Sequence, residues 1–94
     1  MTKEDLLKAV TDEYNVTADE MLSNSRAQIL SEARQMLMYL LVDRMALKTI
    51  EIAAFVNRDH STVVYAIKRI TSLLEFDRIT KKRYERITEK LKSL

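Results

Sequence analysis

The sequence predicts an all-α fold, a compact bundle of five to six helices around a central helix-turn-helix. Its 94 residues include no Gly, Pro, Cys or Trp, and 47% are hydrophobic, a composition that disfavours turn-rich β architectures and favours helices. Apolar residues recur at spacings of three and four, and residues that commonly cap helices come before these runs. No Gly- or Pro-rich linker divides the chain, so we expect one domain spanning residues 1–94.

The first 22 residues predict two helices. Thr2 is suited to cap the first helix and Asn15 to end it. Thr17 and Glu20 form a T-x-x-E capping box for a short second helix through about Leu22. The first helix is expected to turn four side chains inward: Leu6, Leu7, Val10 and Tyr14.

The segment from Ser23 to Gln28 is predicted to be a loop, after which Ser31 can cap a long central helix. Thr80 can begin the last helix of the chain. The inward side chains of the long helix are expected to be Ala33, Met36, Leu37, Leu40, Leu41 and Met45, and those of the last helix Ile87, Leu91 and Leu94.

Helices over about 50–56 and about 60–74 are predicted to form the helix-turn-helix. A small residue, Ala53, allows the two helices to approach, and Asn57 tolerates the left-handed backbone of a tight turn. Val63 is expected to lock the second helix. The inward face of that helix is predicted to carry Val63, Val64, Ile67, Ile70 and Leu74.

A polar cluster stands at the head of this second helix, where side chains and free backbone N–H groups point outward along the axis. Its members are Arg58, Asp59, His60, Ser61 and Thr62. A polar tip on a packed helix has the shape that enters a major groove, where these side chain types can meet base edges or phosphates.

Composition argues against several other classes of protein. The absence of cysteine excludes disulfides and thiolate metal sites, and no apolar run approaches about 18 residues. The start of the chain lacks the pattern of a signal peptide, so a cytoplasmic protein is expected. With a single histidine and no glycine-rich loop, we expect no enzyme, no cofactor and no metal site.

The charge distribution is uneven along the chain. Residues 1–24 carry two basic and six acidic side chains, whereas residues 25–70 and 71–94 each carry seven basic and four acidic ones. The basic surplus therefore lies on and after the helix-turn-helix, a modest electrostatic footprint for nucleic acid.

The run RDHSTV resembles the RDH[ST]TV signature of the C-terminal DNA-binding domain of the bacterial replication initiator DnaA. Other parts match in order: a short helix ending in LS, a loop with an arginine, and ARQM on the long helix. The resemblance covers nearly the whole chain. It implies a DnaA C-terminal or Trp-repressor-like fold, nucleoid association, and sequence-specific binding of double-stranded DNA in replication initiation or its regulation.

The resemblance also implies roles for individual residues. Arg26 corresponds to an arginine that enters the minor groove, and Arg34 and Gln35 correspond to phosphate contacts. The signature residues correspond to contacts with base edges and phosphates. Lys68 lies two turns beyond the helix tip, so its position indicates a solvated side chain or a peripheral phosphate contact rather than a base reader. The full expected DNA-binding set is Arg26, Arg34, Gln35, Lys48, Thr49, Arg58, Asp59, His60, Ser61, Thr62 and Lys68.

The chain also departs from this family pattern. The loop SNSRAQ has fewer basic residues than is usual, and Asn57 stands where the family has glycine. Without glycine, these 94 residues contain no phosphate-binding loop of the G-x-x-x-x-G-K-[ST] type.

Two alternatives stay open from the sequence. Asp59 can cap the recognition helix or contact a base. The thinned loop and the acidic N-terminal segment also fit a DnaA-like fold used as a protein-interaction or transcription-regulatory module with weak DNA affinity. A protein partner in replication or regulation is expected in that case.

Overall fold

A computed structural model describes all residues from 1 to 94 and contains six α-helices and no strand. The all-α prediction is therefore confirmed. The helices are α1 (Lys3–Tyr14), α2 (Ala18–Met21), α3 (Gln28–Met45), α4 (Thr49–Val56), α5 (His60–Phe76) and α6 (Arg78–Leu91).

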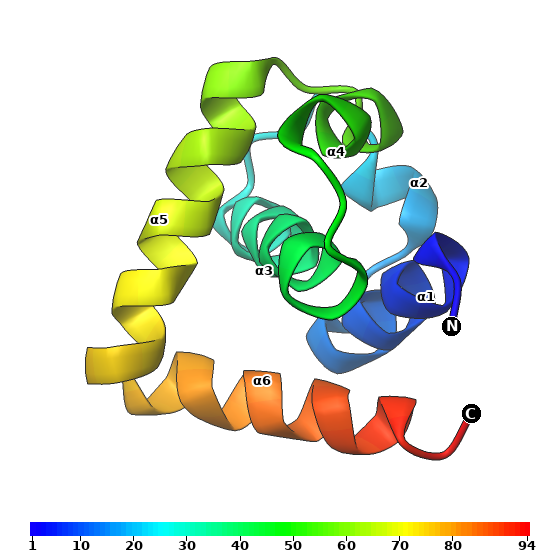
Figure 1. Cartoon of the computed structure of the whole chain (residues 1–94), viewed down its shortest axis with the longest axis vertical. Coiled ribbons are helices and arrows are strands. Elements are labelled where there is room, and N and C mark those ends of the chain that lie inside the picture. Colours follow the sequence, from blue (N-terminus) through cyan, green and yellow to red (C-terminus); the bar gives the residue numbers. More distant parts are fainter.

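Helix α3 is the centre of the bundle, as the sequence predicted. It contacts α1, α2, α4 and α5, while α6 closes the bundle against α1 and α5. Figure 1 shows α5 along one side of the molecule and α6 across its base, with both chain ends on the same side of this view. The side chains of Met36, Leu37, Leu40 and Leu41 are fully buried. Burial of such side chains is the main favourable contribution to the stability of the fold.

Two predicted helix starts are confirmed in detail. Thr2 accepts the backbone N–H of Asp5 at 3.1 Å, and the Asp5 carboxylate accepts the backbone N–H of Thr2 at 2.8 Å. The same reciprocal box joins Thr17 and Glu20. These bonds satisfy N–H groups that have no partner within the helix. Asn15 ends α1 in the left-handed conformation, with φ at 55°.

Two other predicted starts are wrong. Helix α3 begins at Gln28, and Ser31 lies inside it, because the Ser31 N–H already donates to the Ala27 carbonyl at 3.0 Å. Helix α6 begins at Arg78 rather than Thr80. Asp77 is its cap and accepts the backbone N–H of Thr80 at 2.9 Å as well as the Thr80 hydroxyl.

The predicted core is largely confirmed, with differences at the helix ends. Leu94 is 73% exposed because α6 ends at Leu91. Leu7 and Met45 are half-buried and pack against the core from its margin. On α5, Val63 and Ile70 are buried, as expected. The remaining predicted side chains of that helix are half-buried: Val64, Ile67 and Leu74.

Ion pairs hold α6 against α1. Arg86 Nη2 lies 2.7 Å from Glu13 Oε2, and Arg83 Nη1 lies 3.3 Å from the same oxygen. Lys90 Nζ lies 3.6 Å from Asp12 Oδ2. Basic residues of the C-terminal segment therefore face acidic residues of α1, and part of the charge separation seen along the sequence cancels in space.

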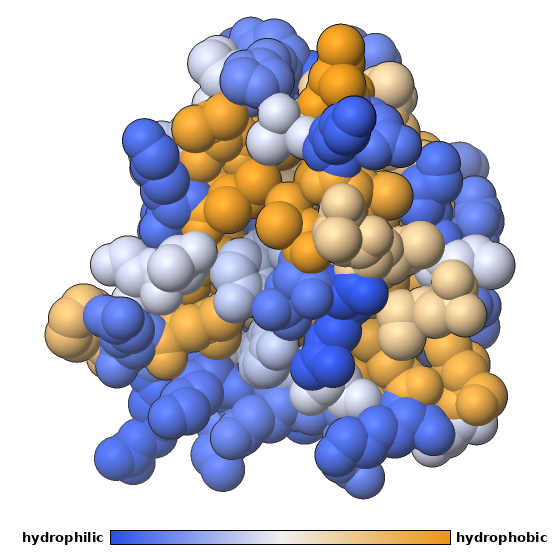
Figure 2. Space-filling model, viewed as in Figure 1, coloured by the Kyte–Doolittle hydropathy of each residue, from blue (hydrophilic) through white to orange (hydrophobic).

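The outer surface is unevenly polar. Figure 2 shows hydrophilic residues along the edge formed by α6 and a hydrophobic area beside α4. Ile50 of α4 is 71% exposed. None of the helices combines the length and the apolar character needed to cross a bilayer.

The Asp77 cap makes stability depend on pH. Hydrogen bonds from the Thr80 hydroxyl and then from its backbone N–H hold the pKa of Asp77 below its ordinary value of 3.8. A carboxyl group with a lowered pKa in the folded state stabilises the fold above its unfolded pKa, and this contribution is lost as pH falls through the folded pKa. We expect Asp77→Ala to be less stable than wild type at pH 7, with a difference that shrinks below pH 3.8.

Urea unfolding of both proteins at a series of pH values measures this difference. Asp77→Asn is the matched control, because its amide oxygen still caps the helix but does not titrate. A difference between wild type and Asp77→Ala that stays constant down to the lowest pH would contradict the assignment.

Candidate nucleic-acid interface

The turn of the helix-turn-helix is built by Asn57, which has φ at 55° and ψ at 51°. This left-handed conformation is one that asparagine tolerates better than most residues, so the prediction is confirmed. The next residue continues the turn, because the Arg58 N–H donates to the Ala53 carbonyl at 3.0 Å. The fully buried Val63 then fixes the start of α5 against the core.

Asp59 is the N-cap of α5. Its Oδ1 accepts the backbone N–H of Thr62 at 2.9 Å, the hydroxyl of Thr62, and the hydroxyl of Ser61 at 3.2 Å. These hydrogen bonds, led by the one from the Thr62 hydroxyl, hold the pKa of Asp59 below its ordinary value. All of them use one carboxylate oxygen, and Oδ2 has no partner in the protein. The cap therefore leaves one acceptor facing outward.

His60 connects the starts of the two helices. Its Nε2 lies 2.8 Å from the hydroxyl oxygen of Thr49, the first residue of α4. The other ring nitrogen makes no hydrogen bond, and the side chain is exposed. Lys48, also exposed, stands just before Thr49. Four of the predicted residues from two segments thus lie together: Lys48, Thr49, His60 and Ser61.

The exposed face of α5 continues beyond this tip. It carries Ser61, Tyr65, Lys68 and Ser72, at spacings of four, three and four, opposite the buried Val63, Ala66 and Ile70. Tyr65 is 61% exposed. This tyrosine is not among the residues predicted from the sequence, although the same helical spacing that located the core also identifies the opposite face.

Arg34, predicted to contact a phosphate, is largely buried and bonded to backbone carbonyls. Its side chain is only 7% exposed. Its Nε donates to the Met21 carbonyl at 2.6 Å, Nη1 to the Ser25 carbonyl at 2.8 Å, and Nη2 to the carbonyls of Glu20 and Ser23 at 3.2 and 3.0 Å. Burial, and then the nearby positive charge of Arg58, lower the pKa of Arg34. Backbone carbonyls of α2 and of the following loop thus surround the guanidinium, and its role as a phosphate contact stays a prediction.

Arg58 is also turned back into the protein. Its Nη2 donates to the Ser23 carbonyl at 2.6 Å, and its Nη1 donates to the carbonyls of Val56 and Asn57 at 3.2 and 3.0 Å. The side chain is half-buried rather than extended from the tip of α5. Since Arg34 and Arg58 share the Ser23 carbonyl, they join the loop to the helix-turn-helix.

This junction places Arg26 beside the turn. A shallow hollow is lined by Asn24, Ser25, Arg26, Arg34, Asn57 and Arg58, and in it the side chain of Arg26 is exposed. The predicted minor-groove arginine and the predicted recognition helix therefore meet at one edge of the molecule. Gln35 lies deeper, half-buried, and its Oε1 accepts a hydrogen bond from Arg69 Nη1 at 3.0 Å.

Comparisons with known proteins agree with this architecture. A family model described as the bacterial dnaA protein helix-turn-helix matches residues 3–70. The chromosomal replication initiator protein DnaA of Nostoc punctiforme is 34% identical over 89 residues, which cover 94% of this chain and 19% of that protein. The corresponding protein of Oenococcus oeni is 33% identical over 93 residues, covering 98% and 21%.

The DnaA protein of Gloeobacter violaceus is 44% identical over 71 residues, covering 74% of this chain and 16% of that protein. The chain thus spans about a fifth of the length of these relatives. The family resemblance inferred from RDHSTV and ARQM is confirmed. The chain belongs to the bacterial DnaA helix-turn-helix family and corresponds to the C-terminal domain of DnaA.

Proposed function

We propose that this domain binds double-stranded DNA, with the start of α5 in the major groove and Arg26 in the adjacent minor groove. It would read a short DnaA-box-like site, in replication initiation or its regulation. The observation that carries the proposal is the placement of two unlike binding elements at one edge. The exposed polar tip of α5 and the exposed Arg26 lie next to the same turn.

The tip offers groups suited to base edges. The free Oδ2 of Asp59 can accept from a cytosine amino group while Oδ1 keeps its capping bonds. The capping and base-reading interpretations of this residue are therefore compatible. The unpaired ring nitrogen of His60 and the Ser61 hydroxyl stand beside it. The planar guanidinium of Arg26 suits a narrow, electronegative minor groove.

Few exposed basic side chains around the tip are available to contact phosphates. Arg34 and Arg58 use their guanidinium groups on loop carbonyls, which leaves Lys48, Lys68 and Arg26 as the exposed basic side chains around the tip. Each phosphate contact adds about 0.9 to the magnitude of the salt slope of binding, so we propose a shallow salt dependence.

A protein-interaction or regulatory module with weak DNA affinity is the second candidate. It is favoured by the same withdrawal of two arginines from the surface. Retention of a protein partner independently of salt, with no duplex bound at about 50 mM salt, would support it over DNA binding.

Replacement of His60 tests the base-reading tip. His60→Ala should weaken binding to a family-type nine-base-pair box by about 1–3 kcal/mol and relax specificity at one base pair. Fluorescence anisotropy with the box, its single-base variants and a scrambled duplex measures both effects. Thr71→Ala, which removes an exposed hydroxyl from the same helix far from the tip, is the control. Affinities unchanged on every duplex would refute the proposed role of the tip.

Replacement of Arg26 tests the minor-groove contact. Arg26→Ala should lose about 1–3 kcal/mol of binding, and Arg26→Lys should recover only part of it, because an ammonium is compact and lacks the planar guanidinium. The loss should be largest on duplexes with an A·T-rich flank, whose minor groove is narrow. Equal losses on A·T-rich and G·C-rich flanks, measured in the same titration, would count against insertion into the groove.

Arg34 and Lys68 form a matched pair of basic residues with opposite expected effects. Arg34→Ala leaves loop carbonyls without their donors and should lower the free energy of unfolding by at least about 2 kcal/mol. It should not change the salt slope of DNA binding, provided that folded protein is measured. Lys68→Ala should leave stability unchanged and reduce the slope by about 0.9. A reduced slope for Arg34→Ala, with normal stability, would restore the phosphate role expected from the family.

A further inference from the structure

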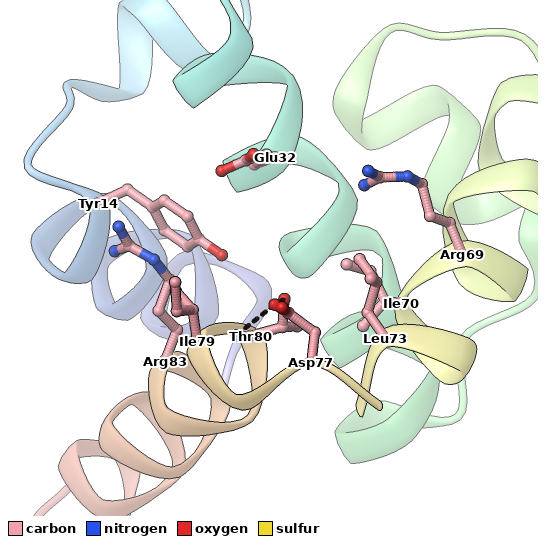
Figure 3. A pocket seen from close by; sticks show the side chains of 9 residues that line it. All are labelled: Tyr14, Glu32, Arg69, Ile70, Leu73, Asp77, Ile79, Thr80 and Arg83. Carbon is pink, nitrogen blue, oxygen red and sulfur yellow. Dashed lines mark hydrogen bonds between the residues drawn. The ribbon is translucent and has the colours of Figure 1, made fainter. Parts of the chain in front are cut away.

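A cavity of about 360 Å³ lies where α1, α3, α5 and α6 meet. Figure 3 shows it from close by, with the side chains of Tyr14 and Glu32 on one part of its wall and those of Arg69 and Asp77 on another. No side chain that we propose for DNA contact lines it. The full lining consists of Tyr14, Glu32, Arg69, Ile70, Leu73, Asp77, Ile79, Thr80 and Arg83.

The Tyr14 hydroxyl is an unpaired polar group in this cavity. The side chain is only 6% exposed, and its hydroxyl makes no hydrogen bond within the protein, although it is turned toward the middle of the cavity in Figure 3. Burial is the main cause that raises the pKa of Tyr14 to about 12, so the hydroxyl keeps its proton at neutral pH. The hydroxyl oxygen itself is not sealed from solvent, so from inside the cavity it can hydrogen-bond to water or to a bound group.

Arg83 is already engaged by α1 through one of its guanidinium nitrogens. Its guanidinium lies 4.3 Å from the centre of the Tyr14 ring, and Nη1 lies 3.3 Å from Glu13 Oε2. The guanidinium therefore packs over the face of the tyrosine ring. The hydroxyl end of the ring projects into the cavity.

The other charged groups around the cavity are of both signs and keep free hydrogen-bonding capacity. Glu32 Oε1 accepts from Gln28, and Asp77 Oδ2 accepts from Thr80, which leaves one oxygen free on each carboxylate. Arg69 donates through Nη1 to Gln35 and has no other partner for its guanidinium. Apolar side chains complete the wall: Ile70, Leu73 and Ile79.

We propose that this cavity binds a small zwitterion with an aliphatic body, such as a free α-amino acid. The ammonium group donates to the free oxygens of Glu32 and Asp77, and the ligand carboxylate accepts from Arg69 and the Tyr14 hydroxyl. The aliphatic part packs against Ile70, Leu73 and Ile79.

The mixed charge of the wall selects this ligand chemistry over simpler ions. An anion alone would face two carboxylates, and a cation alone would face the guanidinium of Arg69, so each would leave a charge on the wall without a partner. The volume is at the small end of the range for ligand pockets, about 300–1,000 Å³, which fits a molecule of amino-acid size.

The experiment is an NMR titration of the ¹⁵N-labelled chain with L-leucine, N-acetyl-leucine and leucinamide, without DNA. We expect L-leucine to shift the amide signals of Tyr14, Arg69 and Ile79, with saturation in the millimolar range that is typical of a ligand with few atoms. The two derivatives, each lacking one charge, should bind at least about tenfold more weakly, as expected for the loss of one charged contact. No shift at about 10 mM leucine, or equal affinity for the three probes, overturns the proposal.

Tyr14→Phe tests the hydroxyl itself, because it keeps the ring and its contact with Arg83. We expect weaker leucine binding with an unchanged melting temperature. Tyr65→Phe, which removes the hydroxyl of the exposed tyrosine on α5, is the control and should bind leucine like wild type. Wild-type affinity in Tyr14→Phe also overturns the proposal. The comparison of the three probes on wild-type protein does not depend on whether a variant folds.

Discussion

The carbonyl oxygen of Ser23 is the point at which the proposed DNA-binding edge is assembled. A guanidinium from the central helix, that of Arg34, and one from the turn before the recognition helix, that of Arg58, both donate to it, at 3.0 and 2.6 Å. Hydrogen bonds to charged donors are among the stronger ones in proteins, and this pair joins segments 35 residues apart. Without it, the loop that carries Arg26 has no polar attachment to the helix-turn-helix.

In this arrangement, the charged groups of Arg34 and Arg58 position the loop instead of attracting DNA. Two arginines that would otherwise increase the electrostatic attraction for DNA are enclosed by backbone carbonyls, and several basic residues of α6 pair with acidic residues of α1. In the proposed interface, an edge with few exposed charges would favour selective contacts over general attraction to phosphate. The double use of the Asp59 carboxylate, one oxygen for the cap and one turned outward, follows the same pattern.

Helix α5 connects the proposed DNA-binding edge to the end of the molecule that contains the cavity. Helix α5 carries the proposed base-reading tip at its start, and its last turns form a wall of the cavity with Tyr14. Gln35 and Arg69 tie the middle of α3 to the middle of α5, so both sites rest on the same two packed helices. Packed helices transmit small displacements, because protein interiors are dense.

Local patterns along the sequence determined the helices, the turn and the family. Capping boxes at Thr2 and Thr17, the left-handed Asn57 and the cap by Asp59 involve residues within a few positions of one another, so a linear pattern contains all the atoms concerned. The start of α6 was missed because Asp77 and Thr80 are both good capping residues, and only the backbone path decides between them.

Only the tertiary structure decided which polar residues face solvent. The sequence cannot show that Arg34 is enclosed, because its partners come from a loop that folds back over α3. Nor can it show that the acidic start of the chain neutralises part of α6, or that Tyr14, expected in the core, opens onto a cavity. Periodicity places a side chain on one face of its own helix, but the neighbour that covers that face depends on how distant segments pack.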